Sequence, residues 1–147
     1  MENSCSTSLY RVLFLCTGNS CRSQMAEALT NTFLGNQWSA SSAGTQPSGY
    51  VHPLAVQALK EIAITHQGFS KSVERFRNEP FDLVVTLCDD AEQNCPVWLG
   101  KGKRLHIGFF DPAEVQGSDA EKMAAFRGVR DEIKARILPV LTSFTPS

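Results

Sequence analysis

The sequence predicts a single-domain α/β fold, a doubly wound four-stranded parallel sheet with helices on both faces. Three observations support it: short apolar runs alternate with helical patterns, the chain of 147 residues has the size of one domain, and no repeat or linker divides it. Right-handed crossovers place the connecting helices over the sheet. We expect residues 1–10, polar and rich in serine, to form a flexible N-terminal tail and residues 11–147 to form the single domain.

Four segments have the character of strands. Continuous apolar runs at Arg11–Leu15 and Leu83–Leu87 are typical of strands buried on both faces of a sheet. Weaker candidates are Trp38–Ser42 and Arg104–Ile107. In doubly wound sheets, ligands bind beyond the carboxyl ends of the strands, where the winding direction reverses. The residues directly after the two strong strands are therefore candidates for a site, and both are cysteines.

Three helices are expected between and after these strands. The first has apolar residues at helical spacing, Met25, Ala26, Leu29 and Phe33, and ends before Gly35. The second begins at Pro53, since proline is tolerated in a first helical turn, and presents one apolar face formed by Leu54, Ala55, Ala58, Leu59 and Ile62. The third follows a capping box of Ser118 and Glu121 and has its apolar positions at Phe126, Val129, Ile133 and Ile137.

Composition and charge exclude several classes of function. A net charge of −1 and an isoelectric point near 6.3 do not provide the clustered positive charge that nucleic acid or an anionic membrane requires. The longest early apolar run, Val12–Cys16, is too short for a signal-peptide core or a membrane span, so we expect a cytoplasmic protein. Five cysteines, an odd number, then favour reduced thiols over a disulfide framework.

The loop after the first strand has the pattern of an oxyanion site with its own nucleophile. Cys16 and Arg22 are separated by five residues, in a short glycine-containing loop that leads into a helix. Such a loop can turn its backbone N–H groups inward around a tetrahedral anion at the positive helix end. Arg22 adds a two-pronged donor, and the positive surroundings favour the thiolate of Cys16. The expected oxyanion-binding residues are Thr17, Gly18, Asn19, Ser20, Cys21, Arg22 and Ser23.

Within this loop, three side chains have expected supporting roles. Ser23 is placed to hydrogen-bond the thiolate, and Asn19 is expected to adopt a positive φ or to tie the loop together. Cys21 is expected to act in packing or loop shape rather than in catalysis.

The block VLFLCTGNSCRSQMAEA at residues 12–28 strongly resembles the low-molecular-weight phosphatase fold family. Within it, CTGNSCRSQMAE is similar to the thioredoxin-coupled arsenate reductases of that family. The resemblance continues through residues 42–44, through residues 83–96 and from Gly108 to the last helix. It implies a four-stranded parallel sheet, reduction of arsenate to arsenite for arsenic detoxification, and thioredoxin as electron donor. Glutaredoxin with glutathione is the alternative donor.

Cys88 and Cys95 resemble the shuttle thiols of these reductases. The resemblance implies that Cys16 attacks arsenate and that Cys88 then attacks the Cys16 sulfur, which expels arsenite and leaves a Cys16–Cys88 disulfide. Cys95 then forms the final, redox-active disulfide with Cys88. A helix over this segment would separate the two α-carbons by about 10 Å, whereas a disulfide requires about 4.4 to 6.8 Å. We therefore expect the segment to change shape on oxidation.

Asp111 in GFFDPAE resembles the general acid of the family, which protonates the departing oxygen. Phosphatases of the family tend to carry tyrosines beside this acid, yet Ala113 and Glu114 follow here. A protein tyrosine phosphatase remains the alternative enzyme, with weak phosphatase activity possible as a side reaction. A non-catalytic phosphate sensor using the same loop is a third interpretation. We expect a monomer.

The sequence bears on two kinds of metal site, zinc and potassium. Structural zinc is disfavoured because Cys88 and Cys95 are too far apart in sequence for a usual ligand pair and Arg22 would oppose a cation. Asn19, Glu27 and Ser42 match positions that help bind potassium in some of the reductases. The fourth position, an aspartate there, is assigned to Ser72 here.

Overall fold

The structure, a computed structural model, describes residues 9–89, 98 and 100–145. The predicted thiol Cys95, and with it most of the segment expected to change shape, lies outside the described residues.

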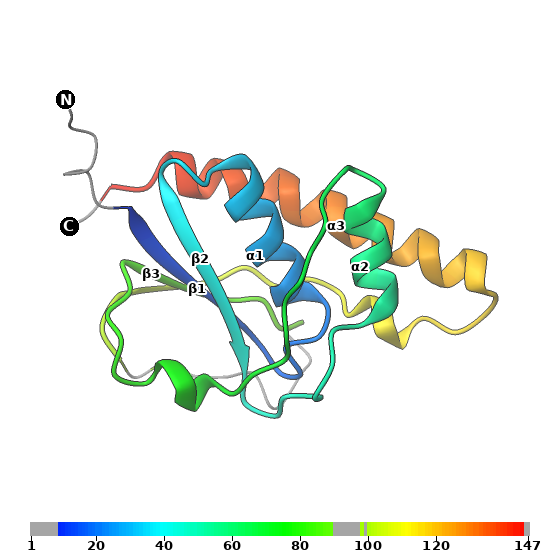
Figure 1. Ribbon diagram of the computed structural model, residues 1–147, viewed down its shortest axis with the longest axis horizontal. Coiled ribbons are helices and arrows are strands. Elements are labelled where there is room, and N and C mark those ends of the chain that lie inside the picture. The colour runs from blue at the N-terminus through cyan, green and yellow to red at the C-terminus, as the bar shows by residue number, and fades with distance from the viewer. Residues whose placement is uncertain (1–8, 90–97, 99, 146–147) are drawn as a thin grey trace.

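A four-stranded parallel sheet forms the centre of the molecule (Figure 1). Its strands are β1 (Tyr10–Cys16), β2 (Trp38–Gly44), β3 (Leu83–Thr86) and β4 (Lys103–His106), in the spatial order β2-β1-β3-β4. All neighbouring strands pair in parallel. The winding direction therefore reverses between β1 and β3, and the predicted α/β fold class is confirmed.

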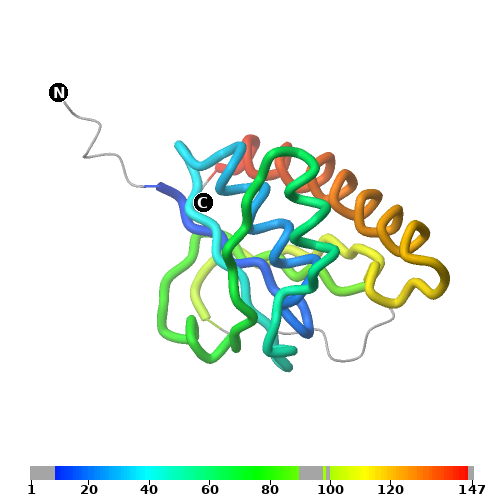
Figure 2. The backbone as a smooth tube through the Cα atoms, turned by 45° about the vertical axis from the view of Figure 1, so that its right-hand side comes forward, coloured from blue at the N-terminus to red at the C-terminus, as the bar shows by residue number. Residues whose placement is uncertain are grey.

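Three α-helices pack together over one face of the sheet (Figure 2). They are α1 (Arg22–Phe33), α2 (Pro53–Lys60) and α3 (Asp119–Thr142). Alternation along β1 explains the two-sided burial: Val12 and Phe14 belong to the core beneath these helices, whereas Leu13 and Leu15 point to the opposite face. The strong apolar run of β1 thus contributes to two cores.

The opposite face is covered differently from the prediction of helices on both sides. Among the described residues it carries the short 3₁₀ helix η2 (Val73–Phe76) together with loop side chains, rather than an α-helix. Phe81 packs edge-on against both Phe76 and Trp98, with ring centroids 5.8 Å apart in each pair. These aromatic rings fill the layer that a crossover helix would otherwise occupy.

Element boundaries differ from the sequence in small ways that have local causes. β1 begins at Tyr10, inside the expected tail, because its backbone N–H donates to the carbonyl of Gln37 and its ring packs 5.2 Å from that of Trp38. α2 ends at Lys60, before Ile62, and Ala63 then takes a positive φ of 66° that reverses the chain.

The edge strand β4 has all four side chains exposed, and charged residues such as Lys103 and Arg104 are common on edge strands. The capping box of Ser118 and Glu121 is confirmed at the start of α3. No helix in the described part of the chain is long and apolar enough to cross a membrane.

Candidate active site

A cavity of about 260 Å³ opens where β1 meets α1. Its wall contains most of the predicted oxyanion-binding residues, and Asp111 and Glu114 close it from the other side. The lining residues are Cys16, Thr17, Gly18, Ser20, Cys21, Arg22, Asp111 and Glu114. Asn19 and Ser23, the remaining two of the predicted set, are fully buried and do not line the cavity.

Asn19 and Ser23 support the nucleophile from behind. The Sγ atom of Cys16 lies 2.8 Å from Oγ of Ser23, and the amide nitrogen of Asn19 donates to that same hydroxyl oxygen at 2.8 Å. With a donor already directed at its oxygen, the Ser23 hydroxyl can point its hydrogen at the sulfur of Cys16. Asn19 has a φ of 49°, which agrees with the positive value expected from the sequence.

Arg22 and Asp111 bring opposite charges to the cavity. Arg22, the first residue of α1, is buried, and its guanidinium donates to the carbonyl of Phe109 at 3.2 Å. Another of its nitrogens lies 3.6 Å from Oδ2 of Asp111. The other oxygen of Asp111 accepts the backbone N–H of Ala113 at 3.0 Å, which caps the short helix η3 (Pro112–Glu114). The cap and the ion pair hold this carboxyl over the cavity.

Cys88 reaches the same loop because of the strand register. Leu15 of β1 pairs with Thr86 of β3. Two residues further along each parallel chain, Cys88 therefore lies beside Thr17. The Sγ atom of Cys88 is fully buried and lies 3.9 Å from Oγ1 of Thr17. The structure thus places a second thiol next to the loop of the first, at the point where the winding reverses, as the sequence indicated.

Cys21 differs from Cys16 in its electrostatic surroundings. Burial raises the pKa of the Cys21 thiol to about 12, and the charges of Asp111 and Cys16 act in the same direction. A group with a raised pKa stays protonated below that pH, so Cys21 is a neutral thiol under ordinary conditions. It cannot serve as a second nucleophile, which agrees with its expected role in packing.

We predict that iodoacetamide will spare Cys21 between pH 7 and pH 9. At pH 9, with a pKa of about 12, only about one thiol in a thousand is ionised. Peptide mass spectrometry of protein alkylated for increasing times measures this, with modification of Cys16 as the internal comparison. Equal alkylation rates at the two cysteines would contradict the assignment.

Two polar residues beneath the loop, the buried Gln24 and the half-buried His66, were not singled out as functional from the sequence. Gln24 donates through its amide nitrogen to the carbonyl and side-chain oxygens of Asn19, both at 3.1 Å, and to the carbonyl of Phe69 at 2.9 Å. Its oxygen therefore faces Nε2 of His66 at 2.7 Å, which must carry the hydrogen. Burial lowers the pKa of His66, in keeping with a neutral ring. Gln24 lies within the CTGNSCRSQMAE block but was assigned no role, and no local sequence signal marks His66.

A charged cluster lies beside this network. The Ser42 hydroxyl donates to the Glu27 carboxylate at 2.6 Å, and the Lys71 ammonium lies 3.8 Å from the same carboxylate oxygen. Lys71, not Ser72, occupies the fourth place of the cluster, because the Ser72 side chain turns away to cap η2. The side chain assigned to that place from the sequence, Ser72, does not enter the cluster in this structure.

The donor atoms of this cluster do not fit potassium. Both hydrogen-bonding positions of the Asn19 side-chain oxygen are used, by the backbone N–H of Lys71 at 2.9 Å and by Gln24. The Ser42 hydroxyl accepts from the Lys71 ammonium at 3.4 Å while it donates to Glu27. A second cation would also meet the ammonium itself. Burial lowers the pKa of Lys71, and the Glu27 carboxylate opposes that shift.

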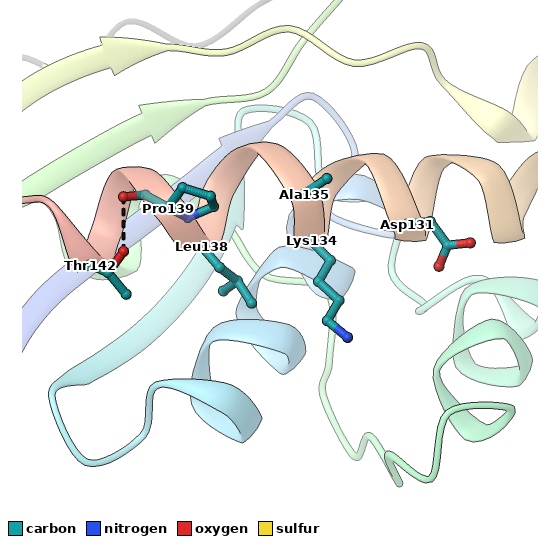
Figure 3. A pocket seen from close by; sticks show the side chains of 6 residues that line it. All are labelled: Asp131, Lys134, Ala135, Leu138, Pro139 and Thr142. Atoms are coloured by element: carbon teal, nitrogen blue, oxygen red, sulfur yellow. Dashed lines mark hydrogen bonds between the residues drawn. The ribbon is translucent and has the colours of Figure 1, made fainter.

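A wider, shallow hollow of about 540 Å³ lies on the outer side of α3 (Figure 3). It is lined by Asp131, Lys134, Ala135, Leu138, Pro139 and Thr142. None of these residues belongs to the nucleophile loop or to its support, so the smaller cavity over Cys16 is the candidate active site.

Curated relatives cover nearly the whole chain. An arsenate reductase of Halalkalibacterium halodurans is 49% identical over 127 residues, which span 86% of this chain and 91% of that protein. An arsenate reductase of Bacillus subtilis is 46% identical over 129 residues, with the same two shares.

Solved structures agree with the fold. An arsenate reductase in its phosphate-binding state has a TM-score of 0.74 at 28% identity, and the match spans 93% of this chain and 100% of that one. A thioredoxin-dependent arsenate reductase of Corynebacterium glutamicum has a TM-score of 0.67 at 28% identity, where 94% of this chain covers 63% of that one. The profile of the low molecular weight phosphotyrosine protein phosphatases matches residues 11–145. With the loop, the sheet order and the relatives in agreement, the chain belongs to the low molecular weight phosphotyrosine protein phosphatase family.

Proposed function

We propose that this chain is an arsenate reductase that works through a thiol relay from Cys16 to Cys88 to Cys95. The observation that carries the proposal is the buried Cys88 thiol beside Thr17, because a hydrolytic enzyme with this loop has no need of a second thiol there. The relatives named arsenate reductases, which match this chain over most of their length, support the same conclusion.

The first step is nucleophilic attack. The Cys16 thiolate displaces one oxygen of arsenate and forms a sulfur–arsenic(V) bond. Arg22 and the backbone N–H groups of the loop hold the remaining oxygens, and Asp111 supplies the proton with which the departing oxygen leaves as water. Ser23 supports the thiolate before attack.

The second step transfers two electrons. The Cys88 thiolate attacks the sulfur of Cys16, a disulfide forms, and the sulfur–arsenic bond breaks with its electron pair moving to arsenic. Arsenic(V) is thereby reduced to arsenic(III), which leaves as arsenite. Phosphorus in the same loop would not follow this course, so phosphate is a ligand of the site and not an oxidant.

The third step regenerates the nucleophile. Cys95 attacks the sulfur of Cys88, which releases the Cys16 thiolate and leaves a Cys88–Cys95 disulfide. A dithiol protein then reduces that disulfide by exchange. Thioredoxin is the proposed donor, supported by the thioredoxin-dependent relative of known structure, and glutaredoxin with glutathione is the alternative. A reducing cytoplasm suits this cycle.

A tyrosine phosphatase is the second candidate, favoured by the family and by the same Cys16 cavity. In the described part of the chain, however, no aromatic side chain lines the cavity, and Glu114 contributes a carboxylate there. An aryl phosphate would find neither a stacking partner nor charge complementarity at this rim. We therefore assign hydrolysis of phosphate esters at most to a weak side activity.

Arsenate-dependent oxidation of NADPH, coupled through purified thioredoxin and thioredoxin reductase, tests the proposed function. The expected result is steady turnover that requires arsenate. A parallel assay with glutaredoxin, glutathione and glutathione reductase distinguishes the two electron donors. Turnover with neither system, combined with rapid hydrolysis of phosphotyrosine, would establish the phosphatase instead.

Asp111→Asn is expected to slow release of the arsenate oxygen by roughly 10²- to 10⁴-fold, the range for a lost general acid. Asparagine caps helices as well as aspartate does, so the hydrogen bond from Ala113 and the shape of η3 are retained. Rapid-quench measurement of the first turnover reports the chemical step, and phosphate affinity reports whether the cavity is intact. An unchanged first-turnover rate would remove Asp111 from the mechanism.

A further inference from the structure

Lys71 places a positive charge beneath the oxyanion loop. Its side chain is only 11% exposed, and its ammonium donates to the Phe69 carbonyl at 3.0 Å and to the Ser42 hydroxyl at 3.4 Å. The Glu27 carboxylate, 17% exposed, lies 3.8 Å away, and the Phe69 ring lies below at 4.8 Å. A long, flexible side chain is thus held in place by contacts on several sides.

The backbone of Lys71 connects this charge to the nucleophile. Its N–H donates to the side-chain oxygen of Asn19 at 2.9 Å, which fixes the orientation of that amide because a backbone N–H can only donate. The Asn19 nitrogen must then face Ser23, and Ser23 contacts the sulfur of Cys16. The carbonyl of Lys71 accepts the N–H of Gly44, at the end of β2. Lys71 is therefore bonded on both sides to elements that hold the loop.

Charge balance explains why a cation is needed there. A mostly buried carboxylate without a partner is strongly destabilising. Among the described residues, the neutral hydrogen bond that Glu27 receives comes from Ser42. The Lys71 ammonium supplies the matching charge. The Phe69 ring, which packs against the Lys71 ammonium, also lies 4.9 Å from the Arg75 guanidinium. An added cation would therefore enter a region that is already positive.

We propose that Lys71 is a positioning residue whose ammonium serves as a built-in cation for the oxyanion loop, so that oxyanion binding by this chain needs no potassium ion. This inference rests on one part of the proposed function, the binding of a tetrahedral oxyanion by the loop, and does not depend on arsenate reduction. It is therefore tested on binding, where its failure is distinct from a failure of arsenate reduction.

The test measures the affinity of the whole protein for inorganic phosphate by calorimetry, in potassium chloride and in choline chloride of equal ionic strength. The wild-type affinity is expected to be the same in both salts. In Lys71→Met, which keeps most of the side-chain volume but removes the charge, affinity in choline chloride is expected to fall by about 10- to 100-fold, the usual effect of losing a group that orients a site. Potassium should restore part of this loss.

Two further variants separate charge from packing. Lys71→Arg should bind phosphate nearly as the wild type does, since the charge is kept. Lys134→Met is the matched control, because it also removes a lysine over a surface phenylalanine ring, that of Phe33 at 4.3 Å, but far from the loop. It should show neither weaker binding nor a potassium effect.

A double variant tests the electrostatic origin directly. Glu27→Gln combined with Lys71→Met removes the carboxylate that needs a cation, so potassium should no longer affect binding, and the two changes should be non-additive. Circular dichroism shows whether Lys71→Met is folded. A potassium-dependent affinity in the wild type, or equal affinities for Lys71→Met and Lys134→Met, would overturn the proposal.

Discussion

Cys16→Ser is expected to abolish arsenate reduction and any hydrolysis of aryl phosphates together, because one thiolate starts both reactions. Removal of an enzyme nucleophile has cost about 10⁶-fold in turnover where it was measured. The hydroxyl still fits beside Ser23, so the cavity should persist and bind phosphate. Coupled NADPH oxidation, release of p-nitrophenol and phosphate calorimetry measure the three quantities on one preparation.

The matched control is Cys21→Ser, the same substitution five residues further along the same loop. Since the Cys21 thiol is neutral at working pH, this variant should retain turnover. Substantial arsenate reduction by Cys16→Ser, or its loss in both variants alike, would refute the assignment of Cys16 as the nucleophile.

Cys88→Ser is expected to eliminate arsenite release while leaving a weak phosphatase activity intact. Without the second thiol, nothing attacks the Cys16 sulfur to reduce arsenic(V), so the adduct can only return arsenate by hydrolysis, whereas hydrolysis of a phosphorylated Cys16 completes the phosphatase reaction. The Thr17 hydroxyl, 3.9 Å from the sulfur in the wild type, offers the new buried hydroxyl a partner, so a folded protein is expected. Arsenite release and p-nitrophenyl phosphate hydrolysis, measured side by side, test this separation.

Cys95→Ser serves as the companion variant, since it removes the third thiol and leaves the first two. It should stop after one turnover, with Cys16 and Cys88 joined. Peptide mass spectrometry of the arsenate-treated variant would detect that bond. Arsenite release by Cys95→Ser without a Cys16–Cys88 disulfide would rule out the relay in this order.

Local sequence patterns predicted much of the fold correctly. The strand–loop–helix unit around Cys16 is recognisable because its signals are contiguous: an apolar run, a glycine-containing loop and an amphipathic helix. The capping box of α3 is equally local, since Ser118 and Glu121 bond each other. The position of Cys16 and Cys88 directly after two buried strands predicted that both lie at the carboxyl edge of the sheet, and the strand order of the structure brings them to the same loop.

The ends of the strands and helices, and the side chains that cover the second face of the sheet, were less predictable because they depend on residues distant in the sequence. Tyr10 joins β1 only through contacts with Gln37, Trp38 and Phe144. The second face of the sheet is filled by aromatic rings that come from separate segments, and no periodic pattern marks them.

The sequence by itself determined the fold class and the nucleophile loop, since each depends on neighbours in the chain or on the alternation of strands and helices. Only the tertiary structure decided what supports that loop. Gln24 meets His66 across 42 positions, Lys71 reaches Asn19 across 52, and Glu27 meets Ser42 across 15. Such contacts leave no spacing rule in the sequence, because their geometry is set by how α1 and β2 pack against the segment around Lys71. Lys71, to which the sequence assigned no role, is a cation with only 11% of its side chain exposed, whereas the neighbouring Ser72 side chain caps η2.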